Sequence, residues 1–394
     1  MQLIKHIKAS NILSFGPDGL DLPLGSLNIL IGANGSGKSN FIELFALLRS
    51  TPRSAEDSKN NLQGVIRRGG GVLEWIWKGY QDKPASVQVK FGRSPALLHE
   101  IVFRHSDQRF WLDTEQISGP APEPSKQGES IYYRGELFFS QIKRYKEIIE
   151  SDPEIIGHHI GGNSILSLRR DSVAYPEISF IASNYEKIRL YREWNFGRNT
   201  IFREPQKADL RNDRLEEDFS NLGLYLNQIG RHPQAKRQLV NALRDLYEGL
   251  EGYEVLIEGG TVQVFFTEGN FTIPATRLSD GSLRYLCLLA ILLDPTPPPL
   301  ICIEEPELGM HPDMLPKIAD LLKDAAQRTQ LIVTTHSDIL VDAMTDQPES
   351  VLVCEKHDGQ TSIKRLNSEE LTPWLEQYRL GQLWSRGEIG GNRW

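Results

Sequence analysis

Gly32-Ala33-Asn34-Gly35-Ser36-Gly37-Lys38-Ser39 is the stretch of this 394-residue chain that decides its fold. It fits the phosphate-binding pattern in which a glycine-rich turn ends in lysine and serine. An apolar run at 27–31 precedes it and reads as a strand, and residues 40–45 begin a helix. A glycine-rich turn without a ligand is the alternative, but it gives no reason for lysine and serine to follow the last glycine in register. The sequence therefore predicts a nucleotide-binding α/β fold.

The residue types of this loop suit a triphosphate. Glycines let the backbone pass close to phosphate oxygens, where a Cβ would clash. The turned N–H groups and the helix N-terminus hold the anion. Lys38 is expected to reach the β- and γ-phosphates, and the Ser39 hydroxyl to ligate Mg²⁺. ATP and Mg²⁺ are the expected cofactors, and the expected nucleotide contacts in the loop are Asn34, Gly35, Ser36, Gly37, Lys38, Ser39 and Asn40.

Two carboxylates follow the apolar run at 300–303, which reads as a buried parallel strand. Open α/β sheets place their chemistry at the carboxyl ends of such strands. Glu304 is expected to help hold Mg²⁺ through water, and Glu305 to orient or deprotonate the attacking water. Adjacent buried carboxylates repel each other and need a cation nearby, which Mg²⁺ and Lys38 supply. The alternative is a solvated strand end, and the continuation Pro306-Glu307 argues against it.

A histidine follows a third apolar strand, at 331–333, in the run Thr334-Thr335-His336. A histidine after a strand is usually structural. This one comes one helix-plus-strand crossover after the carboxylate strand, so both groups belong at the same sheet edge. His336 is therefore expected to hydrogen-bond the γ-phosphate and the attacking water.

Leu278-Ser279-Asp280-Gly281-Ser282 precedes a strongly helical apolar run at 283–290. Ser279 is a good helix N-cap, and Gly281 permits a close backbone approach. Taken alone, an ordinary capped helix is the favoured interpretation. The stretch resembles the signature segment of ABC ATPases, which also lies shortly before the carboxylate strand, and this resemblance implies a nucleotide contact.

Together these motifs resemble the SMC/RecF-like branch of ABC ATPases, and within it the bacterial AAA-type predicted ATPases related to the ATPase domain of OLD-family proteins. Residues 4–15, 304–312 and 380–394 are also similar to that group. The resemblance implies an ABC-head P-loop fold: a mostly parallel sheet sandwiched by helices, an antiparallel β-lobe and an inserted helical subdomain. It also implies a head-to-tail homodimer or higher oligomer, in which Ser279 and Gly281 of one subunit close on ATP held by the other.

The chain departs from the family pattern in three places. Glu304 stands where transporters have aspartate, and His311 occupies the position that usually holds the aspartate of the D-loop. No Q-loop glutamine can be placed, and Gln141 is the candidate. Activation of one subunit by that D-loop residue of the other is therefore in question.

The expected organisation has five segments: an ATPase lobe with the phosphate loop at 1–65, a β-lobe at 66–165 with a mobile loop near 119–127, a helical subdomain at 166–252, a second ATPase lobe at 253–345, and a hairpin with a tail at 346–394. Alternating patterns at 72–77, 85–91, 100–104 and 109–112 predict antiparallel strands. Residues 203–252 predict two or three helices. Segments 351–355 and 361–366 predict a hairpin.

Composition limits the partners. The net charge of −8 gives no overall nucleic-acid footprint. The basic and aromatic segment 189–203 is compatible with phosphate contacts and base stacking, or equally with aromatic packing under a solvated face. No apolar run approaches the roughly 18 residues of a membrane helix. The three cysteines lie in apolar runs without metal-ligand spacing. We expect a cytoplasmic protein without a membrane partner.

Three functions remain open at this point. The first is an ATPase that clamps DNA or passes a switch to a separate nuclease or toxin effector, in anti-phage defence or genome maintenance. The second is an ATP-driven dimerisation module with little turnover. The third, and least supported, is the nucleotide-binding subunit of a transporter. The tail after His336 is too short for the nuclease domain of OLD-type proteins, so any cleavage would need a separate partner.

Overall fold

The computed structural model describes residues 2–120, 129–136, 139–144, 147–197, 200–245 and 249–391. A six-stranded central sheet has the order β10-β15-β16-β3-β17-β18. Its strands are β3 (Leu27–Ile31), β10 (Arg189–Tyr191), β15 (Leu300–Glu304), β16 (Gln330–Thr334), β17 (Val351–His357) and β18 (Gln360–Arg365). The first five in the sheet order run parallel, and β18 returns antiparallel to β17. The predicted strands at 27–31, 300–303 and 331–333 and the predicted hairpin are confirmed.

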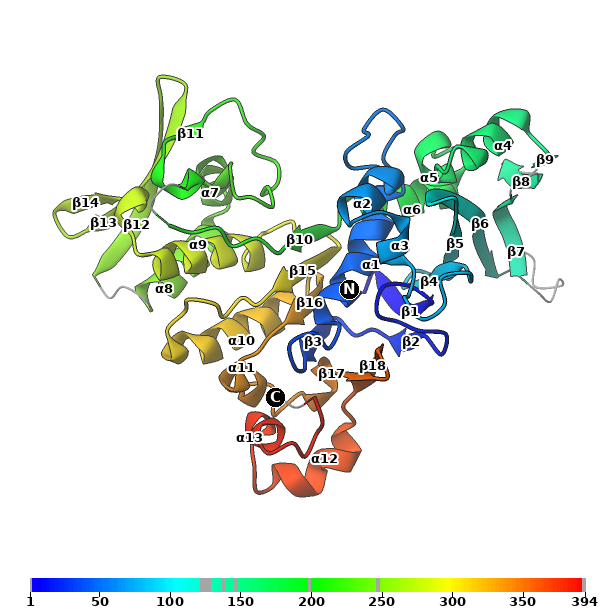
Figure 1. Ribbon diagram of the computed structural model, residues 1–394. Coiled ribbons are helices and arrows are strands. Elements are labelled where there is room, and N and C mark those ends of the chain that lie inside the picture. The colour runs from blue at the N-terminus through cyan, green and yellow to red at the C-terminus, as the bar shows by residue number, and fades with distance from the viewer. Residues whose placement is uncertain are drawn as a thin grey trace.

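Each face of the central sheet packs against its own core. In β3, Leu30 belongs to a core with α1 (Lys38–Ser50) and α6 (Pro176–Glu186). Its neighbours Ile29 and Ile31 belong to a core with α9 (Asp280–Leu292), α10 (Leu315–Ala325) and α11 (Asp338–Asp342). Both faces are apolar because helices cover both sides of the parallel strands. The sheet therefore lies between two helical layers, as Figure 1 shows.

An eight-stranded antiparallel sheet flanks α1 and α6 and corresponds to the expected β-lobe (Figure 1). Its order is β2-β1-β4-β5-β6-β7-β8-β9. The strands are β1 (Ile4–Ser10), β2 (Leu20–Pro23), β4 (Ala85–Phe91), β5 (Leu98–Ser106), β6 (Arg109–Pro120), β7 (Glu129–Glu136), β8 (Phe139–Arg144) and β9 (Glu147–Glu150). The predicted strands at 85–91, 100–104 and 109–112 are confirmed. Of the predicted loop at 119–127, Gly119 and Pro120 end β6, and 121–127 lie outside the described residues.

The strand predicted at 72–77 is wrong. Residues Val72–Trp75 form the short helix α3 instead, and Ile76 makes a single antiparallel bridge to Ile12. Val72, Trp75 and Ile76 are all buried. Their spacing of three and four residues is the spacing of one helix face, so a short apolar segment fits a helical turn as well as a strand. The other helices around this lobe are α2 (Leu62–Arg68), α4 (Pro153–Ile160) and α5 (Ile165–Leu168).

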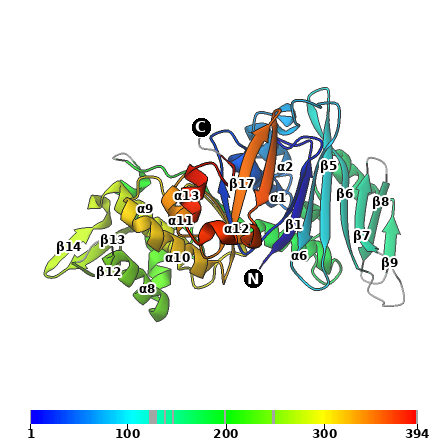
Figure 2. The same cartoon turned by 90° about the horizontal axis from the view of Figure 1, so that it is seen from below.

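A third, four-stranded sheet lies at the opposite end of the molecule from the β-lobe (Figure 2). It contains β11 (Gln206–Lys207), β12 (Leu250–Glu258), β13 (Thr261–Glu268) and β14 (Phe271–Pro274), with α7 (Leu222–Gly230) and α8 (Pro233–Arg244) packed against it. Two helices therefore form in 203–252, as predicted. The strands β12 to β14 were not predicted. Much of β12 is exposed, so it lacks a continuous apolar pattern.

The chain ends with α12 (Ser368–Leu375) and α13 (Leu380–Ser385), and four short 3₁₀ turns are η1 (Ile201–Arg203), η2 (Ala275–Arg277), η3 (Pro312–Met314) and η4 (Pro348–Ser350). The indole of Trp384 donates to Gly391 O at 2.7 Å, and the N–H of Gly391 donates to Glu355 at 2.9 Å. These bonds hold the tail against β17. Across the described ranges, every helix is too short or too polar to cross a bilayer. The division of the chain into five segments stays a prediction.

Candidate nucleotide-binding site

The predicted phosphate loop, carboxylates and histidine meet at one edge of the central sheet. Glu304 lies opposite Thr334 in the β15–β16 register, and Thr334 lies opposite Leu30 in the β16–β3 register. Three neighbouring strands therefore end together, and the segments that follow them carry Lys38, Glu305 and His336. This is the edge at which open α/β sheets place their ligands.

The loop after β3 has the backbone that a phosphate needs. Gly35 and Gly37 have φ of 75° and 106°, in the left-handed region that favours glycine. A Cβ built on Gly35 meets no atom within 4 Å, so the loop is open on that side. Ser36 is buried, and its Oγ has no hydrogen-bond partner among the described residues. The loop thus offers a buried polar atom and a helix N-terminus to an anion.

Lys38 begins α1 and is almost fully buried, at 6% exposed. Its Nζ donates to Gly32 O and Ala33 O, both at 2.9 Å. Burial lowers the pKa of Lys38, and nearby carboxylates, including Glu305 and Glu304, oppose that shift. The ammonium therefore lies inside the loop, close to acids, where a phosphate group would complement its charge.

Glu304 lies beside Ser39, the other residue expected to hold Mg²⁺, and beside Arg192, which the sequence did not place at the site. Burial raises the pKa of this carboxyl, and Arg192 and the Ser39 hydroxyl lower it. The Nε of Arg192 is 3.3 Å from Glu304 Oε1, which has no hydrogen-bond partner among the described residues. The two side chains expected to hold Mg²⁺, Ser39 and Glu304, are thus neighbours.

Glu305 has a strained backbone, with φ of 46°. Residues other than glycine seldom adopt this conformation, and it is concentrated at functional sites. The N–H of Glu305 donates to Thr334 O at 3.0 Å, which ties the turn to β16. Glu305 Oε1 is 3.5 Å from His336 Nε2. The structure therefore brings the two residues expected to handle water side by side.

Glu307 holds the histidine segment in place, a role that the sequence analysis did not assign. Its Oε1 accepts hydrogen bonds from the Thr335 hydroxyl and the His336 N–H, both at 2.7 Å. Its Oε2 is buried without a hydrogen-bond partner in the described part of the chain. Burial raises the pKa of Glu307, and the bond from His336 N–H opposes that rise. The repeated carboxylates in Glu-Glu-Pro-Glu were the only sequence signal for this contact.

Arg192 and Trp194 are two further residues that the sequence analysis did not place at the site. Arg192 contacts Glu43 on α1 at 2.7 Å, and the Trp194 indole donates to Glu304 O at 2.7 Å. Arg189 is buried, and Arg203 forms an ion pair with Asp280. For Arg192 and Arg203 the structure favours the packing interpretation of segment 189–203 over a nucleic-acid surface.

The segment with Ser279 and Gly281 lies away from Lys38 of the same chain. Ser279 caps α9 by accepting from Ser282 N–H at 3.1 Å, and it is exposed. Because α9 packs on the opposite face of the sheet from α1, this segment does not approach the phosphate loop (Figure 1). A Cβ on Gly281 would be 2.9 Å from Gly309 O, so glycine allows α9 to pack against the loop after Glu307.

Two weaker candidates have different outcomes. Gln141 lies in β8, near the far edge of the eight-stranded sheet, and its amide is 3.5 Å from Glu150. That position separates Gln141 from the phosphate loop, and the Q-loop assignment is wrong. His311 is exposed and lies 3.3 Å from Asp313, at the start of η3. The exposed position leaves His311 accessible to another molecule.

The residues present fit ATP with Mg²⁺. The fit rests on a glycine turn with left-handed φ, a buried lysine, and two buried polar atoms without hydrogen-bond partners in the described ranges, Ser36 Oγ and Glu304 Oε1. Among the described residues no cluster of three or more histidine, cysteine or acidic side chains could hold a metal by itself. A metal at Ser39 and Glu304 would therefore take other ligands from phosphate and water.

Comparison with known proteins gives one family and one fold. The family model described as "AAA domain, putative AbiEii toxin, Type IV TA system" matches residues 27–342. The chain is similar to the Smc head bound to the C-winged helix domain of ScpA, with 15% identity, a TM-score of 0.52, and coverage of 93% of this chain and 99% of that one. The chain is also similar to the Pyrococcus furiosus Smc head with an extended coiled coil, bound to the C-terminal domain of ScpA. The identity is 14% and the TM-score is 0.55, and the match covers 96% of this chain and 99% of that one.

A third similar structure is the Pyrococcus yayanosii Smc head with a coiled coil and joint. The identity is 12% and the TM-score is 0.50, and the match covers 96% of this chain and 99% of that one. No curated protein matches the sequence. At these identities the likeness to the Smc heads is one of fold.

Proposed function

The chain belongs to this AAA-domain family and has the SMC-head fold, as the resemblance implied, and on that premise we propose that it is an ATP-hydrolysing switch. ATP-dependent pairing of two heads sets the state of the switch. The state is passed to DNA or to a separately encoded effector, in anti-phage defence or genome maintenance. The observation that carries the proposal is the meeting of Lys38, Glu305 and His336 at the ends of adjacent parallel strands.

The side chains divide the work of hydrolysis. Lys38, Ser39 and the loop N–H groups hold the phosphates, and Mg²⁺, when bound, neutralises phosphate charge. Glu305 orients the attacking water and accepts its proton, and His336 lies close enough to share that water. Glu307 keeps the His336 backbone fixed to the same loop. Positioning and charge complementarity are the main contributions a protein makes to phosphoryl transfer.

Two copies are needed to complete the site. Ser279 and Gly281 lie at the N-terminus of α9, on the other side of the sheet from Lys38. A second head, facing the first head to tail, would bring the N-terminus of its α9 to the γ-phosphate, where a helix N-terminus stabilises an anion. Nucleotide binding and dimerisation then become one event, and hydrolysis releases the pair.

The experiment that tests this function is sizing of the Glu305→Gln protein with and without ATP and with and without DNA. We expect a stable dimer with ATP, because glutamine keeps the volume of glutamate but cannot accept a proton. Glu369→Gln, an exposed change on α12, is the matched control and should behave like the wild type. A Glu305→Gln protein that stays monomeric with bound ATP would contradict the switch.

Wild-type turnover separates this function from a bare dimerisation module. If DNA or a partner activates hydrolysis, the switch is supported. If turnover is slow and no nucleic acid or partner changes it, the dimerisation module is the better description.

A further inference from the structure

A cavity lies at the opposite edge of the central sheet from the phosphate loop. Its volume is about 470 Å³, and it opens at the amino ends of β10 and β15. The three prolines before β15, Pro297 to Pro299, form one wall. The cationic side chains that line it are Lys187, Arg189, Arg214 and Arg328. ATP is expected at the carboxyl ends of these strands, so this cavity is a separate site.

Arg189 is the buried cation of the cavity, at 6% exposed. One guanidinium nitrogen donates to Glu186 O at 2.9 Å and to Ile188 O at 2.8 Å, at the C-terminal end of α6. Within the described residues, no carboxylate lies within ion-pairing distance of Arg189. Burial and the neighbouring Arg214 lower the pKa of Arg189 to about 10. Two guanidinium groups therefore lie close together, and Glu217, which itself pairs with Arg49, is the carboxylate that opposes the drop in the pKa of Arg189.

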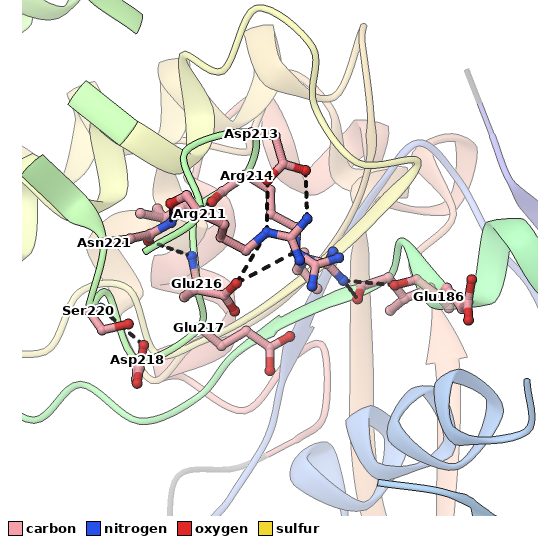
Figure 3. A network of polar contacts seen from close by, with 12 residues as sticks. Glu186, Arg211, Asp213, Arg214, Glu216, Glu217, Asp218, Ser220 and Asn221 are labelled. Carbon is pink, nitrogen blue, oxygen red and sulfur yellow. Dashed lines mark hydrogen bonds and ion pairs between the residues drawn. The ribbon is translucent and has the colours of Figure 1, made fainter. Parts of the chain in front are cut away.

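Arg214 is only partly compensated by acids. Its Nε is buried without a hydrogen-bond partner in the described part of the chain, and the nearest acid, Glu216, is 3.7 Å away. Glu216 also lies 3.5 Å from Arg211. Arg211 in turn donates hydrogen bonds to both carboxylate oxygens of Asp213, at 2.8 and 2.6 Å. Figure 3 shows this chain of contacts, with Arg214 at its end. Arg211 thus engages Asp213 and Glu216, whereas Glu217 pairs with Arg49.

The remaining acid of the cavity, Asp294, interacts with Tyr225, Thr296 and Arg328. Asp294 accepts from Thr296 N–H at 2.8 Å, and burial raises the pKa of this carboxyl. Arg328 donates to Leu292 O at 2.7 Å and to Asp294 O, at the end of α9. Capping of α6 and α9 explains part of the contacts of Arg189 and Arg328. It does not explain Arg214, or the clustering of four cations around one cavity.

We propose that this cavity binds a phosphate group, with Arg189, Arg214, Arg328 and Lys187 as its cationic contacts. Guanidinium groups match the geometry of phosphate and bind it with paired hydrogen bonds. The volume lies within the range of about 300–1,000 Å³ that small-molecule sites have. The phosphate belongs either to a small metabolite or to the end of a nucleic-acid strand, and both sources present the same terminal group.

The test must distinguish this cavity from the phosphate loop, which also binds phosphate. Orthophosphate and adenosine monophosphate are titrated by calorimetry into the wild type, Arg214→Met, Lys187→Met and Lys38→Ala. We expect Arg214→Met to weaken one saturable binding event about tenfold, since the variant loses a charge-assisted hydrogen bond to the phosphate. Lys38→Ala should leave that event intact. Arg231→Met, an exposed change outside the cavity, is the matched control.

A short oligonucleotide with and without a 5′-phosphate identifies the source of the group. Tighter binding of the 5′-phosphorylated strand than of adenosine monophosphate assigns a nucleic-acid end, and the reverse order assigns a metabolite. The proposal is overturned if no phosphate ligand binds saturably in Lys38→Ala, or if Arg214→Met and Lys187→Met both leave that binding unchanged.

Discussion

The two edges of the central sheet both hold buried cations, but they balance the charge differently. At the carboxyl edge, Lys38 lies among Glu304, Glu305 and Glu307, whose carboxylates favour its charged form. At the amino edge, Arg189 has backbone carbonyls as hydrogen-bond partners and a second arginine as a neighbour. The first arrangement suits a ligand that brings its own cation, such as Mg²⁺ with ATP. The second suits an anion that arrives alone.

The two edges also differ in how they are built. The carboxyl edge takes its groups from loops that directly follow three adjacent strands, so short contiguous motifs describe it. The amino edge takes its groups from the end of α6, the start of β10, and the segments that precede α7, β15 and β16. Its polar network is visible in Figure 3 and has no compact motif. Four predictions test the carboxyl edge, and each would change the comparison if it failed.

The largest effect is expected from Lys38→Ala. Loss of the ammonium leaves phosphate charge uncompensated in a buried loop, so ATP binding should fall below detection. Equilibrium binding of a labelled ATP analogue measures it. Lys364→Ala, an exposed change on β18, is the control and should bind normally. Normal ATP affinity in Lys38→Ala would refute the nucleotide site and would leave the amino edge as the better anion site.

Glu305→Gln should lower steady-state turnover by about 100-fold, in the range for removal of a general base. ATP affinity should stay close to that of the wild type, because the phosphate contacts remain. Phosphate release and equilibrium binding, measured on the same preparation, separate the two quantities. Equal losses in binding and turnover would show that Glu305 supports the loop and takes no part in the chemistry.

Ser279→Arg should bind ATP but pair poorly. A bulky cation at the exposed start of α9 would weaken dimerisation by about 2 kcal/mol, or roughly 30-fold, as disruption of a central interface contact does. Sedimentation with ATP measures the effect. A mixture with Lys38→Ala should restore at most one composite site. Unchanged dimerisation would mean that α9 does not face the nucleotide of a second copy.

The smallest effect is expected from Glu307→Gln, with turnover reduced about tenfold through a less well-held His336. A pH series of stability tests the burial of this carboxyl. Since burial raises its pKa in the folded state, the folded protein binds more protons there than the unfolded chain. Wild-type stability should therefore fall as pH rises above the ordinary pKa of glutamate.

Glu307→Gln lacks this titrating group and should lose less stability over the same pH range. Thermal unfolding from acidic to neutral pH measures the difference. Parallel pH profiles for the two proteins would contradict the buried role of Glu307.

The sequence predicted which residues meet at the carboxyl edge, because the ends of neighbouring parallel strands lie side by side and each motif follows one of these strands. Lys38, Glu305 and His336 each follow an apolar strand, so the order of motifs along the chain was enough to place them together. Short patterns were less reliable. Residues 72–77 fit both a strand and a helical turn, and only packing against the β-lobe selected the helix. The basic and aromatic residues at 189–203 gave no sign of whether they face solvent or protein.

By itself the sequence determined the fold class, the phosphate loop and the residues that follow each central strand, because these depend on local order and on apolar runs. Only the tertiary structure decided that Arg192 and Trp194 meet Glu304, that Ser279 lies across the sheet from Lys38, and that four cations share a cavity at the amino edge. These contacts join residues far apart in the chain. Their formation depends on how helices and strands pack, which no single segment encodes.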